Sequence, residues 1–121
     1  MLHTILLVDD SSQIRRSLRS YIENFPEWEV CGEAENGQQG IERAQQLRPD
    51  LIVLDLSMPV MNGMEAASIL KHLMPAVPLI IFSDYSSLIS DTQARSAGVS
   101  ALVSKTESLS MLLGKASALL A

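Results

Sequence analysis

Several apolar runs in this 121-residue sequence end at side chains that could do chemistry together. Carboxylate oxygens suit Mg²⁺, which binds one or two of them, keeps several waters and accepts phosphate oxygens. A lysine ammonium is a compact positive charge for a phosphoryl group, and an aspartate can act as a nucleophile that forms an acyl phosphate. The side chains concerned are Asp9 and Asp10, Asp55, Ser83 with Asp84, and Lys105. Their types indicate a divalent cation site beside a phosphoryl acceptor.

Each of these residues alone has a simpler explanation. An aspartate that follows a strand usually caps a helix or forms a turn, and one of Asp9 and Asp10 could cap the next helix. A lone serine such as Ser83 is usually a loop hydroxyl, and a lone lysine such as Lys105 is usually solvated. The hypothesis therefore depends on the joint placement of complementary groups after four different strands.

The elements that would position these residues alternate between short apolar runs and longer segments of helical period. Continuous apolar runs are typical of strands buried on both faces, whereas the alternating run at Trp28 predicts a strand nearer an edge. Strands are expected over Ile5–Val8, Trp28–Gly32, Leu51–Leu54, Pro78–Phe82 and Ala101–Val103. Helices are expected from the Ser11-Ser12 cap to Phe25, after the Asn36-Gly37 turn through Ile41, Ala44 and Leu47 to Arg48-Pro49, over Met64–Met74, over Ser86–Ala97 with Gly98 as its C-cap, and over Leu109–Leu120.

This rhythm predicts a single α/β domain over residues 1–121, with a parallel sheet and helices on both faces. Right-handed crossovers place the carboxyl ends of all the strands on one edge of the sheet. Ligands of open parallel sheets bind at that edge, where the strand order reverses. The predicted topology therefore brings the four groups of polar residues together.

Composition excludes several classes of protein. With 9 Lys and Arg against 14 Asp and Glu, the net charge of −5 excludes DNA binding by bulk charge. Cys31 is the single cysteine, so neither an internal disulfide nor a cysteine metal cluster can form, which favours a reducing compartment. The sequence has no apolar stretch near the length of about 20 residues that a membrane span needs. We therefore expect a soluble, cytoplasmic protein.

In combination, these residues resemble the receiver domain of bacterial two-component response regulators. The resemblance covers essentially the whole chain and rests on the acidic pair at Asp9, on Asp-Leu-Ser-Met-Pro-Val-Met-Asn-Gly from Asp55, on Ser83 and on Lys105. The segments 33–37 and 48–50 resemble the subclass with a helix-turn-helix DNA-binding output domain. The resemblance implies a doubly wound, flavodoxin-like (βα)5 fold with a five-stranded parallel sheet of order 2-1-3-4-5.

The resemblance also implies a separate role for each acidic residue. Asp55 matches the phosphoacceptor and is one of the groups around the Mg²⁺ ion. Asp10 matches the direct metal ligand, whereas Asp9 acts mostly through a metal-bound water. The backbone carbonyl of Ser57 matches a further metal contact.

The other matched residues contact or sense the phosphoryl group in this family. Lys105 matches the lysine that pairs with it, and Ser83 matches the hydroxyl residue that moves toward it. Met58-Pro59 and Gly63 match the loop that forms the floor of the site.

The partners implied are a sensor histidine kinase as phosphodonor and a C-terminal helix-turn-helix domain in a longer chain. Direct nucleic acid or membrane contact by this domain is not expected, and a homodimer is compatible with the family. The protein would be a signalling switch, with self-catalysed phosphorylation and dephosphorylation, and not a turnover enzyme.

Three residues depart from the family pattern. Asp84 replaces a usually small residue, and it either faces solvent or points inward, where it would repel a phosphodonor or reach the metal through water. Leu102 replaces a common aromatic, so a signal would travel through backbone and loop shifts. Thr106 follows Lys105 in place of proline; a cis bond there would cost about 3 kcal/mol, so the loop is either trans or strained.

Two alternative functions would use a domain of similar layering. A pseudo-receiver would use the same fold as a phosphorylation-independent interaction module, with Asp84 and Leu102 as signs of lost switching. A flavin- or nucleotide-binding domain needs a glycine-rich loop after the first strand, where this sequence has Asp-Asp-Ser-Ser, and is therefore rejected.

Overall fold

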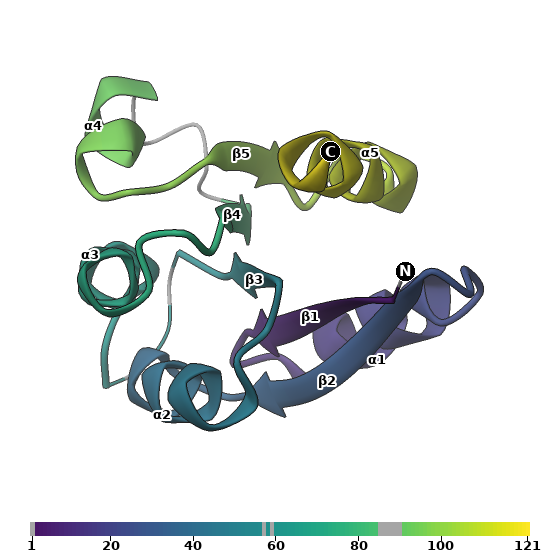
Figure 1. Ribbon diagram of the computed structural model, residues 1–121, viewed down its shortest axis with the longest axis horizontal. Coiled ribbons are helices and arrows are strands. Elements are labelled where there is room, and N and C mark those ends of the chain that lie inside the picture. The colour runs from purple at the N-terminus through teal and green to yellow at the C-terminus, as the bar shows by residue number, and fades with distance from the viewer. Residues whose placement is uncertain (1, 57, 59, 85–90) are drawn as a thin grey trace.

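The computed structural model describes residues 2–56, 58, 60–84 and 91–121, and these residues form a five-stranded parallel sheet between two layers of helices (Figure 1). The strand order is β2-β1-β3-β4-β5, which confirms the order that the family resemblance implies. The order reverses at β1, because β2 and β3 pair with opposite edges of that strand. The predicted ligand-binding edge therefore lies at the ends of β1 and β3.

The strands lie close to their predicted positions. They are β1 (His3–Val8), β2 (Trp28–Ala34), β3 (Leu51–Leu54), β4 (Leu79–Ser83) and β5 (Ala101–Ser104). β2 is an edge strand, as its alternating sequence predicted, but it extends two residues beyond Gly32. A bulge between Ile5 and Leu6 lets Gly32, Glu33 and Ala34 pair with the second half of β1, so cross-strand pairing sets the end of this strand.

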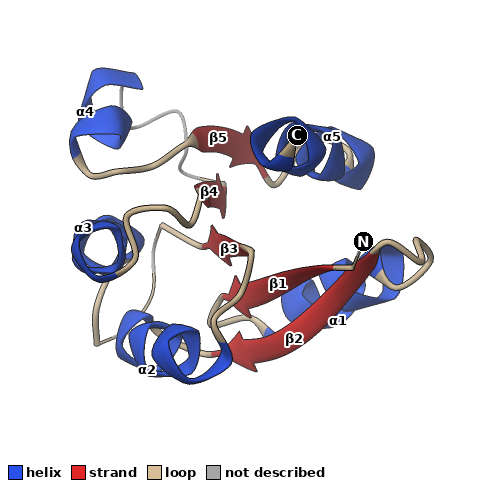
Figure 2. Ribbon diagram, in the orientation of Figure 1, coloured by secondary structure: helices blue, strands red, loops and turns tan. Residues whose placement is uncertain are grey.

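The helices divide between the two faces of the sheet (Figure 2). They are α1 (Ser12–Ile22), α2 (Gly37–Leu47), α3 (Gly63–Leu73), α4 (Asp91–Ser96) and α5 (Leu109–Leu120). α1 and α5 cover one face, and α2, α3 and α4 cover the other. This arrangement confirms the predicted doubly wound architecture.

Two predicted helix boundaries need comment. The prediction that the first helix runs to Phe25 is wrong, because α1 ends at Ile22 and the chain turns there, with Phe25 N donating to Ile22 O. Phe25 still packs against the core, so its apolar character reflects burial in a turn. The first residues of the predicted helix Ser86–Ala97 lie outside the described residues, and α4 is described from Asp91. Gly98 follows it with a φ of +88°, as expected of a C-cap.

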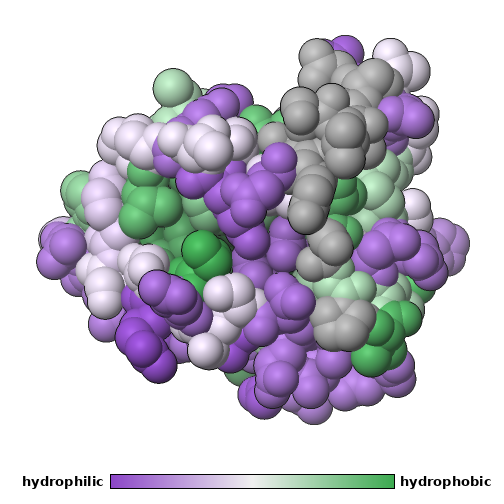
Figure 3. Space-filling view, turned by 180° about the vertical axis from the view of Figure 1, so that it is seen from behind, coloured by the Kyte–Doolittle hydropathy of each residue, from purple (hydrophilic) through white to green (hydrophobic). Residues whose placement is uncertain are grey.

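Alternation along the strands divides the core into two apolar clusters. In β1, Leu6 and Val8 face α2 and α3, whereas Ile5 and Leu7 face α1 and α5. β3 and β4 are buried along their whole length because helices cover both faces of the sheet. The space-filling view shows a band of hydrophilic residues crossing one face of the molecule, with hydrophobic areas on either side (Figure 3). Among the described residues, no helix has the length and apolar character that a membrane span requires.

An ion-pair network fastens α1 to β2. Glu33 on β2 accepts from Arg15 Nε and from Arg19 Nε, each at 2.8 Å, and Arg19 Nη1 also donates to Glu23 at 3.0 Å. Burial alone would raise the pKa of Glu33, but the hydrogen bonds from Arg19 and Arg15 outweigh burial and hold that pKa below its ordinary value. The charged form of Glu33 therefore stabilises the folded chain.

We expect Glu33→Gln to lower the free energy of unfolding at pH 7 by about 1 kcal/mol, a typical value for a hydrogen-bonded, partly exposed ion pair. The folded-state pKa of Glu33 lies below the unfolded value of about 4.3, so this stabilisation is complete above that pH and is lost as the pH falls through the folded-state pKa. Urea unfolding of both proteins from pH 7 to pH 3 measures the difference, with the exposed Glu42→Gln as control. A difference that stays constant over this range would contradict the assignment.

Candidate functional site

The predicted site residues meet at the carboxyl edge of the sheet, where backbone pairing continues just beyond the strands. Asp9 N donates to Ala34 O at 3.0 Å, and Asp55 N donates to Val8 O at 2.8 Å. On the other side, Lys105 N donates to Ser83 O at 3.2 Å. These bonds fix the backbone of each functional residue to its neighbouring strand.

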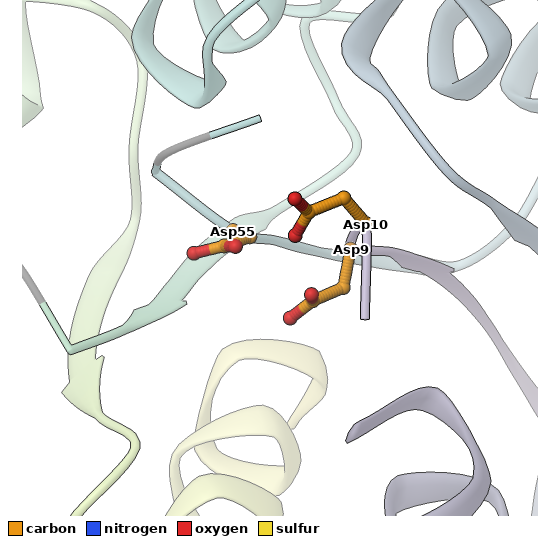
Figure 4. A group of neighbouring side chains, drawn as sticks. All are labelled: Asp9, Asp10 and Asp55. Carbon is orange, nitrogen blue, oxygen red and sulfur yellow. The ribbon is translucent and has the colours of Figure 1, made fainter. Parts of the chain in front are cut away.

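Three carboxylates converge at this edge. Asp9, Asp10 and Asp55 each offer an oxygen within 4.8 Å of the others, and Figure 4 shows their side chains gathered at the ends of β1 and β3. Asp9 and Asp55 are only 3% and 5% exposed, whereas Asp10 is exposed. Three oxygen donors with one open side suit a hard divalent cation that keeps part of its water shell. The cluster can therefore hold a metal ion.

Lys105 supplies the positive charge within this group. Its Nζ lies 2.9 Å from Asp9 Oδ2 and 3.4 Å from Asp55 Oδ2. Burial by itself lowers the pKa of Lys105, but the hydrogen bond and charge of Asp9, together with Asp55, outweigh burial and raise that pKa above its ordinary value. The lysine thus stays protonated and offsets the repulsion between two buried carboxylates.

Asp9 also shapes the entry to α1. Its Oδ1 accepts from Ser11 N at 2.9 Å, and Ser11 Oγ in turn accepts from Ile14 N at 3.2 Å as the N-cap of the helix. Burial raises the pKa of Asp9 above its ordinary value, although the hydrogen bonds from Ser11 and Lys105 act in the opposite direction. Asp9 thus forms a local turn and faces the cluster at the same time.

Ser83, the predicted switch residue, and two of the three departures from the family pattern lie at the carboxyl end of β4 or within β5. Ser83 is the last residue of β4 and is fully buried. Asp84 is exposed and does not belong to the group of three carboxylates, which favours the solvent-facing alternative. Leu102 is half-buried against the apolar cluster beneath α3 and α4, and its carbonyl accepts from Lys115 Nζ at 3.1 Å.

The loop residues give a mixed outcome. The bond between Lys105 and Thr106 is trans, and Thr106 N donates to Ser104 Oγ at 3.2 Å. Met58 is half-buried and packs against the same apolar cluster. Ser57, the predicted carbonyl ligand, and Pro59 both lie outside the described residues.

Two contacts at the site were not anticipated from the sequence. Arg15 Nη1 donates to the backbone carbonyl of Asp9 at 2.6 Å, and no pattern in a single sequence pairs a helix arginine with the carbonyl of a residue that follows a strand. Gly63 begins α3 directly against Asp55, where an added Cβ would overlap the Asp55 carbonyl oxygen. The resemblance had already placed Gly63 in the floor of the site, but its close approach to the Asp55 backbone carbonyl is visible only in the structure.

The sequence of this chain is similar to that of one protein family and to several known proteins. The model of the response regulator receiver domain matches residues 5–117. The nitrate/nitrite response regulator protein NarL of Escherichia coli is 46% identical over 80 residues, which are 66% of this chain and 37% of that protein. A protein-glutamate methylesterase/protein-glutamine glutaminase of Pyrococcus horikoshii is also 46% identical, over 79 residues, which are 65% of this chain and 21% of that protein.

Among solved structures, the response regulator protein TrrA from Thermotoga maritima, in complex with Mg²⁺–BeF, superposes with a TM-score of 0.88. It is 27% identical, and the match covers 98% of this chain and 99% of that one. By contrast, the chain spans only 21% to 37% of the length of the first curated relatives that it matches.

The packing of Gly63 can be tested with a matched glycine. We expect Gly63→Ala to lower the free energy of unfolding by about 1–3 kcal/mol, because the new methyl group meets backbone that cannot move aside. Gly114, in the middle of α5, has open space around an added Cβ, so Gly114→Ala should raise stability by about 0.5–1 kcal/mol. Urea unfolding measures both changes, and equal effects of the two substitutions would contradict the contact at Asp55.

Proposed function

Because this chain belongs to the response regulator receiver domain family, we propose that it is a phosphorylatable switch whose acceptor is Asp55. The observation that carries the proposal is the convergence of Asp9, Asp10 and Asp55 with the Lys105 ammonium placed against two of them. The phosphodonor is a phosphohistidine of a sensor histidine kinase.

The transfer step is a displacement at phosphorus. An Asp55 carboxylate oxygen attacks the phosphorus atom, and a P–O bond forms as the P–N bond of the phosphohistidine breaks. The imidazole leaves with the electron pair of that bond and takes up a proton, and Asp55 becomes an acyl phosphate. Catalysis of such a transfer is mostly positioning and charge stabilisation.

The proposed cofactor is Mg²⁺. Asp10 and Asp55 would bind it directly, Asp9 would act mostly through a metal-bound water, and the carbonyl of Ser57 would be a further ligand. Three carboxylate oxygens and the exposed position of Asp10 support a Mg²⁺ ion at this site. The Mg²⁺–BeF complex of the similar protein TrrA supports it as well. When bound, the cation would offset the negative charge on the phosphoryl oxygens.

Lys105 and Ser83 would respond to the new phosphoryl group. Lys105 already bridges Asp9 and Asp55, so it can pair with a phosphoryl oxygen by a short movement. The hydroxyl of Ser83 would move toward the phosphoryl group and so shift the backbone at the end of β4. With Leu102 in place of an aromatic, the change would pass to the surface through the backbone of β4 and β5.

The output of this switch is proposed to be transcriptional. The match to NarL and the segments 33–37 and 48–50 support a helix-turn-helix domain after the receiver in a longer chain. The receiver, with its net charge of −5, would not contact DNA itself, and it would act in the cytoplasm, as a monomer or homodimer.

The test is covalent labelling with a small acyl phosphate donor and Mg²⁺, read out by intact mass. We expect one added phosphoryl group on the wild type and none on Asp55→Asn, because the amide cannot act as the acceptor. Asp84→Asn, at an exposed carboxylate outside the cluster, should still be labelled. An unlabelled wild type would favour the pseudo-receiver, and labelling of Asp55→Asn would place the acceptor elsewhere.

The position of Trp28 gives an independent check on where the cation binds. Trp28 opens β2 and packs against His3, at the opposite end of the sheet from the acidic cluster. We therefore expect Mg²⁺ to change the tryptophan fluorescence only weakly. Strong quenching on titration with Mg²⁺ would contradict a cation site at Asp9, Asp10 and Asp55.

A further inference from the structure

Arg15 connects the acidic pair to the neighbouring strand. It lies in the first turns of α1, with a side chain only 14% exposed, and its guanidinium donates in two directions. Nε donates to Glu33 Oε1 at 2.8 Å, and Nη1 donates to the backbone carbonyl of Asp9 at 2.6 Å. The guanidinium is planar and its donors are fixed relative to one another. The bond from Nε to Glu33 therefore sets the direction in which Nη1 donates.

The carbonyl that Arg15 contacts belongs to the peptide that joins Asp9 to Asp10. The other side of Asp9 is also fixed, since its N–H donates to Ala34 O at 3.0 Å. The peptide joins two carboxylates in different surroundings. Asp9 is buried against Lys105, whereas Asp10 is exposed. The orientation of the peptide plane decides where the Asp10 side chain leaves the backbone.

Arg19 is a natural comparison within the same network. It shares Glu33 with Arg15, through Nε and Oε2 at 2.8 Å, but its second bond goes to Glu23 and not to the acidic pair. Loss of either arginine therefore removes an ion pair between α1 and β2. Only the loss of Arg15 also frees the Asp9 carbonyl.

We propose that Arg15 is a positioning residue for the cation site. By holding the Asp9–Asp10 peptide against β2, it keeps the Asp10 carboxylate where it converges with Asp9 and Asp55. Arg15 would contact neither the cation nor the phosphoryl group, and its effect would pass through the hydrogen bond to the Asp9 carbonyl. This inference rests on the proposed function, because it assigns Arg15 a role in binding the proposed Mg²⁺ ion.

The experiment compares Arg15→Met with Arg19→Met. Calorimetric titration with MgCl₂ should show a dissociation constant raised about tenfold or more in Arg15→Met, the usual cost of removing an outer residue that orients a metal ligand. In Arg19→Met the dissociation constant should stay near that of the wild type. Urea unfolding should show similar losses of stability in both variants, so a merely structural role predicts equal Mg²⁺ affinities. Equal affinities would overturn the proposal.

A second readout needs no metal. The amide nitrogen of Asp10 is bonded to the carbonyl that accepts from Arg15, so its chemical shift in a ¹⁵N–¹H spectrum reports on that hydrogen bond. We expect a large displacement of the Asp10 resonance in Arg15→Met and little change in Arg19→Met. If the Asp10 resonance is unmoved in Arg15→Met, the proposal is wrong.

These readouts separate the two claims. A wild type that fails to bind Mg²⁺ would contradict the proposed function, while the Asp10 resonance would still decide whether Arg15 holds the peptide. Should Arg15→Met fail to fold, Arg15→Lys replaces it, because a lysine keeps the charge but cannot donate in both fixed directions. Its Mg²⁺ affinity should fall as well, and a wild-type affinity in that variant would overturn the proposal.

Discussion

The structure depends on one electrostatic constraint, the convergence of three carboxylates at the switch point of a parallel sheet. Two of them, Asp9 and Asp55, are buried, and buried carboxylates at this separation repel one another strongly. The Lys105 ammonium lies against both and supplies one positive charge in return. Three carboxylates facing one ammonium group leave an excess of negative charge at the site, which suits it to hold a cation.

The surrounding fold keeps this unfavourable group in place. β1 and β3 are buried on both faces, so their carboxyl ends cannot move apart without exposing the core. Gly63 allows α3 to begin against the Asp55 carbonyl, and Arg15 holds the Asp9 carbonyl from the other side. Lys105 follows the edge strand β5, and its contacts with Asp9 and Asp55 link the end of that strand to the centre of the sheet.

Most of this arrangement was predictable from the sequence because its causes are local. Continuous apolar runs predicted β1 and β3. Asp9 and Asp55 directly follow these runs in the sequence, so their position at the edge of the sheet was predictable too. The end of β2 at Ala34 was not predictable, because a bulge in the pairing with β1 sets it. The contact of Arg15 with the Asp9 carbonyl was not predictable for a related reason. Every residue has a backbone carbonyl, so only the folded chain shows which carbonyl a side chain contacts.

We propose that the acidic cluster accepts a phosphoryl-like anion only after a bound cation has offset part of its negative charge. The most direct measurement is the melting temperature of the protein with Mg²⁺, with beryllofluoride, and with both. The account predicts that beryllofluoride raises the melting temperature beyond the value in Mg²⁺ alone, and that it has no effect when Mg²⁺ is absent. Equal stabilisation by beryllofluoride with and without Mg²⁺, or no stabilisation in either case, would contradict it.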